Sequence, residues 1–160
     1  MLPLAILFYD VVLFVHVLAV VLAFGAVFTY PLLDAYLRRS SPGDLVVLHR
    51  IQVVLSRRLI TPAMVVVLAA GLYLALDRWS LGDPWISSTF TILIVLFGLV
   101  GAVLTPTEKR LAELAEADRR SGGGPSEAYE AQVRKHMAFG GLALLLIVVA
   151  IFLMTVKPGA

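Results

Sequence analysis

A histidine inside an apolar segment is the residue of this sequence with the clearest capacity for chemistry. His16 lies within the run "FYDVVLFVHVLAVVLAFGAVFTYP", residues 8–31, which is otherwise almost entirely apolar. Ionisable side chains in apolar helices of this length usually face the interior of a bundle and mark a functional site. His16 is therefore a candidate metal ligand, proton carrier or cofactor contact. The alternative is a neutral histidine that hydrogen bonds to a neighbouring helix.

Several other polar side chains fall near the depth of His16 when the apolar runs are counted at ~1.5 Å per helical residue. Tyr9 precedes His16 by seven positions and so shares its helix face. Hydroxyl and thioether groups of the other runs lie at a similar level, whereas the opposite halves of the runs are expected to be drier. The predicted site consists of His16, Tyr9, Tyr73, Ser87, Ser88, Met154 and Lys157.

Four apolar runs must position these side chains. They cover roughly residues 4–30, 59–76, 85–104 and 137–156, and none contains Lys or Arg. A bilayer core requires about 20 apolar residues of helix, and continuous apolar runs are typical of helices rather than of alternating barrel strands. The chain is also 60% hydrophobic, well above the roughly 45–50% of soluble domains. We predict an all-α, integral membrane, antiparallel four-helix bundle that forms a single domain over residues 1–160.

The basic residues predict an orientation in the membrane. Five lie in residues 31–58 and six in residues 105–136, which leaves only Arg78 and Lys157 on the opposite side. Loops rich in Lys and Arg stay in the cytoplasm. We therefore expect a multi-pass protein of the cell (inner) membrane, with both termini outside and the two long loops in the cytoplasm. The first apolar run is interpreted as a retained helix, because it lacks the charged start of a signal peptide.

The sequence excludes several classes of site. It contains no cysteine, which rules out disulfides, thiolate metal sites and thiol nucleophiles. It also has no glycine-rich phosphate loop and no His-Glu-x-x-His motif. The charges of residues 105–136 are mixed in sign, which argues against nucleic acid as a partner. The remaining partner is the lipid bilayer, while a homodimer or a larger membrane complex is left open.

Three segments resemble known membrane proteins. "LFVHVLAVVLAFGAVFTYPLL", with His16 and Gly25, "RRLITPAMVVVLAAGLYLAL", and the ending "IFLMTVKPGA" are similar to segments of the HemJ-type protoporphyrinogen oxidases and CopD-like proteins. The likeness is closest to a related uncharacterised family of four-helix membrane proteins. The resemblance implies a bundle that holds b-type haem, with His16 as an iron ligand.

Three functions are therefore weighed. The first is binding of haem b near His16 for electron transfer or membrane redox chemistry, with Arg78 or Lys157 paired to the haem carboxylates. The second is transport of an ion or small solute, and the third is a non-catalytic accessory subunit of a membrane complex. Whether the protein is an enzyme is left open.

Overall fold

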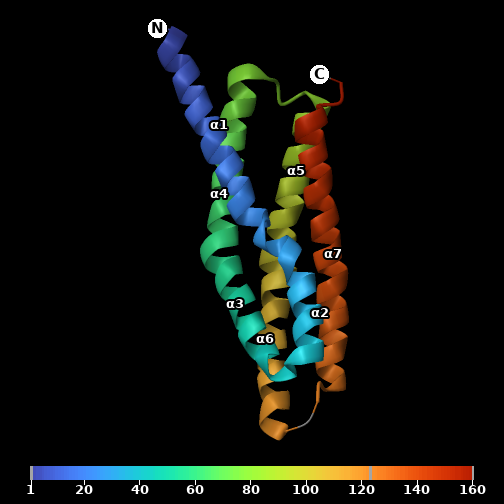
Figure 1. Ribbon diagram of the computed structural model, residues 1–160. Helices are drawn as coiled ribbons and strands as arrows, with labels where there is room; N and C mark the ends of the chain where they lie inside the picture. The colour runs from blue at the N-terminus through green and yellow to red at the C-terminus, as the bar shows by residue number, and fades with distance from the viewer. Residues whose placement is uncertain (1, 123, 160) are drawn as a thin grey trace.

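The described residues form four long helical rods. The computed structural model describes residues 2–122 and 124–159, with side chains from residue 8 onward, and contains no strand in this part of the chain. Successive rods run in opposite directions (Figure 1), and each is long and apolar enough to cross a membrane. The prediction of an all-α, antiparallel membrane bundle is confirmed. We call the end that carries both termini the terminal end, and the opposite end the loop end.

The first rod bends in its middle. It consists of α1 (Leu2–Phe24), the 3-10 turn η1 (Ala26–Thr29) and α2 (Tyr30–Ser40). Gly25 joins α1 to η1, and a Cβ at this position would lie only 2.6 Å from the carbonyl oxygen of Val21. The bend redirects the rod, so that α1 packs on α4 whereas α2 packs on α3.

The second and third rods each contain a π-helical segment. Such segments insert an extra residue into a turn, shift the faces of the flanking helices and occur frequently at functional sites. After the turn η2 (Pro42–Asp44), the second rod runs through α3 (Leu45–Leu55), the π segment η3 (Ser56–Ile60) and α4 (Thr61–Arg78). The third rod runs through α5 (Pro84–Gly98), the π segment η4 (Leu99–Leu104) and α6 (Thr105–Ser121). The fourth rod is the single helix α7 (Glu127–Val156).

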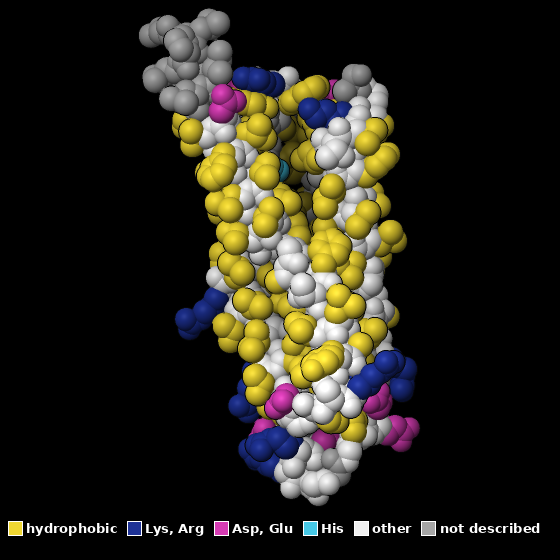
Figure 2. All heavy atoms as spheres, viewed as in Figure 1, with side chains coloured by type: hydrophobic (Ala, Val, Ile, Leu, Met, Phe, Trp, Pro, Cys, Tyr) yellow, Lys and Arg dark blue, Asp and Glu magenta, His cyan; other side chains and the backbone are white. Residues whose placement is uncertain are grey.

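The bundle is closed on three sides and open on the fourth. Helix α1 packs along α4, α3 along α6, and α7 along both α5 and α6. In contrast, α1 and α2 have little direct backbone contact with α7. We call this loosely packed side, between the first rod and α7, the seam. Figure 2 shows the surface hollowed in the upper half of the molecule, between its left and right halves.

The surface is that of a protein surrounded by lipid. Large apolar side chains such as Phe14 and Ile94 are each 64% exposed, and charged side chains gather mostly near the two ends (Figure 2). A bilayer core needs only about 20 helical residues, fewer than the 37 and 38 residues of the second and third rods. With the spans predicted at residues 59–76 and 85–104, α3 and α6 extend beyond the membrane at the loop end.

A separate apolar core holds the loop end together. It is built where α3, α6 and α7 meet, and its members are almost completely buried, with Leu111 at 0%, Tyr129 at 1% and Leu45 at 2% exposure. Because this core lies beyond the predicted spans, burial of its side chains away from water stabilises it.

Replacement of Leu45 by alanine tests this core. We expect Leu45→Ala to lower the free energy of unfolding by roughly 2–5 kcal/mol, the usual cost of a cavity in a packed core. Val47→Ala on the same helix removes a side chain that is 55% exposed and should change stability by no more than about 0.5 kcal/mol. The measurement is thermal or denaturant unfolding in detergent. Equal effects of the two variants would contradict the packing of α3 on α6.

Candidate functional site

A cavity surrounds His16 in the terminal half of the bundle. Its volume is about 250 Å³, and α1, α4, α5 and α7 all contribute to its lining. The imidazole edge lies against Gly71 of α4, where a Cβ would be only 3.0 Å from Cε1 of His16. The ring is partly buried, and its Nδ1 is a buried atom without a hydrogen-bond partner among the described residues. We call this space the His16 cavity.

Most other polar groups of the His16 cavity are already satisfied. The hydroxyl of Thr89 donates to the carbonyl oxygen of Trp85 at 2.7 Å, and that of Thr155 donates to the carbonyl oxygen of Ile151 at 2.8 Å. Met154 also lines the cavity, and its thioether is a soft potential ligand. His16 and Met154 are therefore the side chains of this cavity that remain available to a bound group.

The two tyrosines of the predicted site lie outside the lining of the His16 cavity. Tyr9 is covered by Arg78, whose guanidinium carbon is 3.6 Å from the ring centroid. Tyr73 packs against Phe8 edge to face, with ring centroids 5.3 Å apart. Both rings therefore lie against neighbouring side chains at the terminal end rather than lining the cavity.

The remaining predicted residues are also placed away from the cavity. Ser87 and Ser88 are exposed, and the hydroxyl of Ser87 bonds to carbonyl oxygens of its own helix. The ammonium of Lys157 lies 4.5 Å from the ring centroid of Trp79. The structure thus brings His16 and Met154 together, and it places the other five predicted residues around the terminal end.

A second group of buried polar side chains lies outside the four predicted apolar runs. Near the loop end the structure buries His49, Gln52 and Glu108 at 1%, 1% and 3% exposure. Sequence reasoning missed this group because its members are spread over α3 and α6. The sequence signal for this group is a set of polar residues next to apolar helical positions.

His49 is held by hydrogen bonds on both sides of its ring. Its Nδ1 is 2.8 Å from Oε1 of Gln52, and its Nε2 is 2.8 Å from the hydroxyl of Tyr129 on α7. The ring of Tyr129 also carries the Arg38 guanidinium over its face, at 5.3 Å from the centroid. Burial lowers the pKa of His49 below its ordinary value. A neutral imidazole with two satisfied nitrogens links α3 to α7 and is a structural element.

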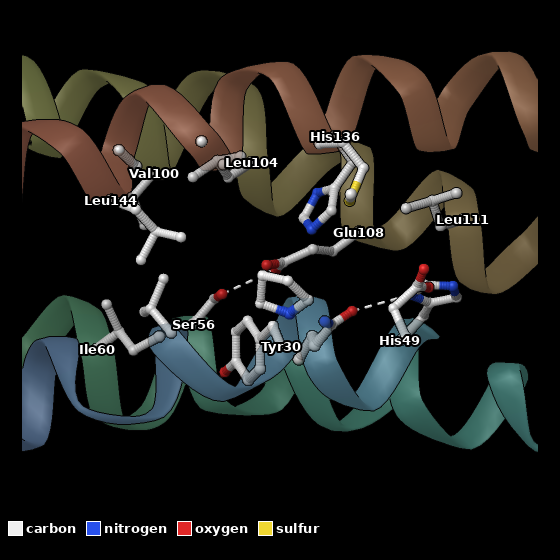
Figure 3. Close-up of a pocket in the computed structure, with 18 of the residues that line it drawn as sticks. Tyr30, His49, Ser56, Ile60, Val100, Leu104, Glu108, Leu111, His136 and Leu144 are labelled. Atoms are coloured by element: carbon white, nitrogen blue, oxygen red, sulfur yellow. Dashed lines mark hydrogen bonds between the residues drawn. The ribbon is translucent and has the colours of Figure 1, made fainter. Parts of the chain in front are cut away.

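Glu108 occupies a second cavity, of about 180 Å³, which we call the Glu108 cavity. Ser56 of the π segment η3 donates a hydrogen bond of 2.8 Å to its carboxylate. Figure 3 shows the Glu108 side chain reaching from α6 toward Ser56, with His136 projecting from α7 on the same side of the cavity. No Lys or Arg is among the residues that line this cavity. Burial raises the pKa of Glu108 to about 7, and the bond from Ser56 offsets this only in part.

Metal binding by protein side chains alone finds no support in the described part of the chain. No three His, Cys, Asp or Glu side chains gather there in a group that could hold an ion.

Comparison with known proteins gives a family but no described activity. A family of predicted integral membrane proteins (DUF2269) matches residues 10–158, almost the whole chain. Neither the curated proteins nor the solved structures contain a match. The match confirms a small membrane protein, and it does not test the resemblance to the HemJ or CopD proteins.

The buried carboxyl of Glu108 makes stability depend on pH. Between pH 4.5 and about 7 the folded protein keeps a proton that the unfolded chain has lost, so stability should fall as the pH rises through this window. At roughly 1.4 kcal/mol per pKa unit, the loss amounts to a few kcal/mol. Melting temperatures in detergent at pH 5 and pH 8 measure it.

Two matched variants isolate this contribution. The lowered pKa values of His49 and His136 make stability rise with pH over part of the same range, so the contribution of Glu108 is the difference in pH dependence between the wild type and Glu108→Gln. From pH 5 to pH 8, the wild type and Glu113→Gln, an exposed position of the same helix, should lose more stability than Glu108→Gln. Equal pH dependence of the wild type and Glu108→Gln would show that burial does not keep Glu108 protonated in the folded state.

Proposed function

The chain belongs to the family of predicted integral membrane proteins DUF2269, and on this premise we propose that its His16 cavity binds b-type haem for electron transfer or membrane redox chemistry. One observation carries the proposal. The Nδ1 atom of His16 is buried and makes no hydrogen bond of good geometry in the described residues, although the imidazole lies within reach of the Val67 backbone. An unmade hydrogen bond costs about 1–3 kcal/mol, and a ligand that uses the ring would offset this cost.

The residues around His16 fit a large, flat and mostly apolar cofactor. The absence of a side chain at Gly71 gives the imidazole a place against α4, which limits its orientation. The cavity of about 250 Å³ is slightly below the roughly 300–1,000 Å³ of typical ligand pockets. A porphyrin would therefore occupy it with one edge in the open seam. Entry through the seam also suits a cofactor that partitions into lipid.

The chain would supply the ligands and the surroundings of the cofactor. His16 would coordinate the iron, and Met154 is the further side chain of the same cavity with a suitable donor atom. The apolar side chains that line the cavity, such as Val20 and Ile147, would exclude water. Bound haem supplies one-electron chemistry, and its potential depends on its axial ligands and on the burial of the site.

The cations of the terminal end would pair with the carboxylates of the cofactor. Arg78 and Lys157 lie against aromatic rings at this end, on Tyr9 and on Trp79 respectively. The excess of basic residues at the other end favours an orientation with the termini outside. The proposed haem thus lies in the outer half of the membrane.

Absorption spectroscopy of purified protein tests the proposal. Titration of the wild type with haemin in detergent should give a shifted and saturable Soret band, and His16→Ala should lose it. Gly71→Ala should weaken haemin binding by about tenfold, because the new methyl group would displace the imidazole and the orientation of a ligand is typically worth 10–100-fold in affinity.

A matched histidine variant serves as the control. His136→Ala removes an imidazole that is outside the His16 cavity, and it should bind haemin like the wild type. If the wild type takes up no haemin, or if His16→Ala binds it equally well, the His16 cavity is not a haem site.

Passage of a small solute or of protons is a second candidate function. It is favoured by the position of the two cavities, which lie one behind the other along the bundle and share Phe24, Leu96 and Ile147 in their linings. These apolar side chains belong to the linings of both cavities and lie between them. We call them the plug.

A smaller plug tests passage. Phe24→Ala should increase the flux of protons or small solutes into liposomes several-fold if the plug is a gate, because the aromatic ring is the largest of the three groups. Phe28→Ala, an exposed position of η1 at 42%, is the control. Flux that is absent from the wild type and from Phe24→Ala alike would remove transport as a function.

A further inference from the structure

The Glu108 cavity lies at the loop-end side of the plug and is distinct from the His16 cavity. Side chains from all four rods line it. Its walls are almost entirely apolar, and its polar members are few and come from different helices (Figure 3). A space built from four separate elements is a feature of the tertiary fold rather than a gap beside one helix.

Three polar groups of this cavity have unused hydrogen-bonding capacity. The hydroxyl of Tyr30, a residue only 9% exposed, and Nδ1 of His136 are buried without partners in the described residues. Glu108 is 3% exposed, and its hydrogen bond from Ser56 engages only one of its two carboxylate oxygens. Each such group costs about 1–3 kcal/mol when it stays unpaired. Two unpaired atoms, together with the second carboxylate oxygen of Glu108, indicate a ligand that satisfies them together.

Both π-helical segments contribute to the same cavity. Ser56 and Ile60 begin and end η3, while Val100 and Leu104 belong to η4, and all four line the Glu108 cavity. A π segment is less stable than a regular helical turn, and it is retained mostly where it positions functional groups. This observation is independent of the unpaired polar atoms and points to the same place.

The charges of the lining limit the chemistry of the ligand. Glu108 and Asp34 are the acidic residues of the lining, and Asp34 is already paired with Arg38 at 2.6 Å. Because no Lys or Arg lines the cavity, a phosphate or carboxylate ligand would meet no counter-charge. A neutral ligand that donates and accepts hydrogen bonds fits this lining.

The seam limits the route by which the ligand arrives. The first rod and α7 are in little direct backbone contact, and both line the Glu108 cavity. On the α7 side, Gly140 and Gly141 present no side chain, and a Cβ at either position would meet nothing within 4 Å. Arg38 of α2 bonds to Glu130 of α7 at 2.9 Å and closes the seam nearer the loop end. A lipid-soluble molecule would therefore enter on the terminal side of this pair, past Gly140 and Gly141.

We propose that the Glu108 cavity binds the head group of a lipid-soluble quinol or quinone. Such a head group is a flat apolar ring with two polar oxygens and a hydrocarbon tail, which would lie in the seam. Glu108 and His136 accept hydrogen bonds from the hydroxyls of a quinol. Tyr30, together with the protonated forms of the same two residues, donates to the oxygens of a quinone. The site can thus hold either form, because each polar group is able to change its role.

The proposal concerns binding and does not rest on haem at His16. Binding can be measured on haem-free protein, so that failure of one proposal leaves the other standing. The probe is a benzoquinol with a decyl tail, and its affinity for the full chain in lipid nanodiscs is measured by equilibrium binding. Decylbenzene, which lacks the hydroxyls, and decylamine, which offers a cation instead, are the comparison ligands.

Three variants test the hydrogen bonds. At pH 8, above the raised pKa of Glu108, Glu108→Gln should weaken binding of the quinol by roughly tenfold or more, because a bond to a charged acceptor is lost. His136→Phe should have an effect of similar size. Tyr30→Phe should weaken binding of the oxidised quinone more than that of the quinol, since the phenol is a donor. The last difference is one that a merely structural role of Tyr30 would not produce.

Glu113→Gln is the matched control. It is the same chemical change on the same helix at an exposed position, and it should leave the affinity unchanged, while melting curves show that each variant is folded. The proposal is overturned if decylbenzene binds as tightly as the quinol, if decylamine binds more tightly, or if Glu108→Gln and Glu113→Gln behave alike.

Discussion

The structure depends on one constraint, which is that hydrocarbon offers no hydrogen bonds to a polar group. Backbone groups meet it by forming helices, and most side chains meet it locally. The hydroxyls of Thr89 and Thr155, for example, bond to carbonyl oxygens of their own helices. Five buried polar side-chain atoms of the described residues do not meet it. His16 Nδ1, the Tyr30 hydroxyl and His136 Nδ1 belong to residues that line the two cavities, whereas Nη2 of Arg38 and Nε1 of Trp85 do not. Three of the five unmet hydrogen bonds thus lie beside empty space.

The same constraint explains why the two ends of the bundle differ. At the loop end α3 and α6 extend beyond the predicted spans, and an apolar core around Leu111 coexists with the His49–Tyr129 bond and the Arg38 ion pairs. Water and counter-charges are near, so placing polar side chains there costs less free energy. At the terminal end Arg78 and Lys157 lie over aromatic rings instead, an arrangement suited to the membrane interface, where such rings are common.

The sequence predicts the fold and part of the candidate site. The features that it predicts and the features that it misses differ for physical reasons. Twenty-residue apolar runs determine the number of helices, and an imidazole among them must turn inward, which places His16. The environment of Ser87 was not predictable from depth, because depth says nothing about which face a side chain occupies or whether it bonds to its own backbone. Glu108 was missed because its burial depends on the pairing of α3 with α6 and on a π turn, and neither leaves a periodic pattern in the sequence.

The seam connects these observations. A bundle whose fourth side is loosely packed loses helix contacts there, and in lipid such contacts contribute through close packing rather than through the hydrophobic effect. Both cavities border α7 and the first rod. The helix contacts are therefore lost at the side where ligands would enter from the membrane. The plug of Phe24, Leu96 and Ile147 keeps the two spaces apart while belonging to both. A group bound in one cavity would therefore contact the same three side chains as a group bound in the other.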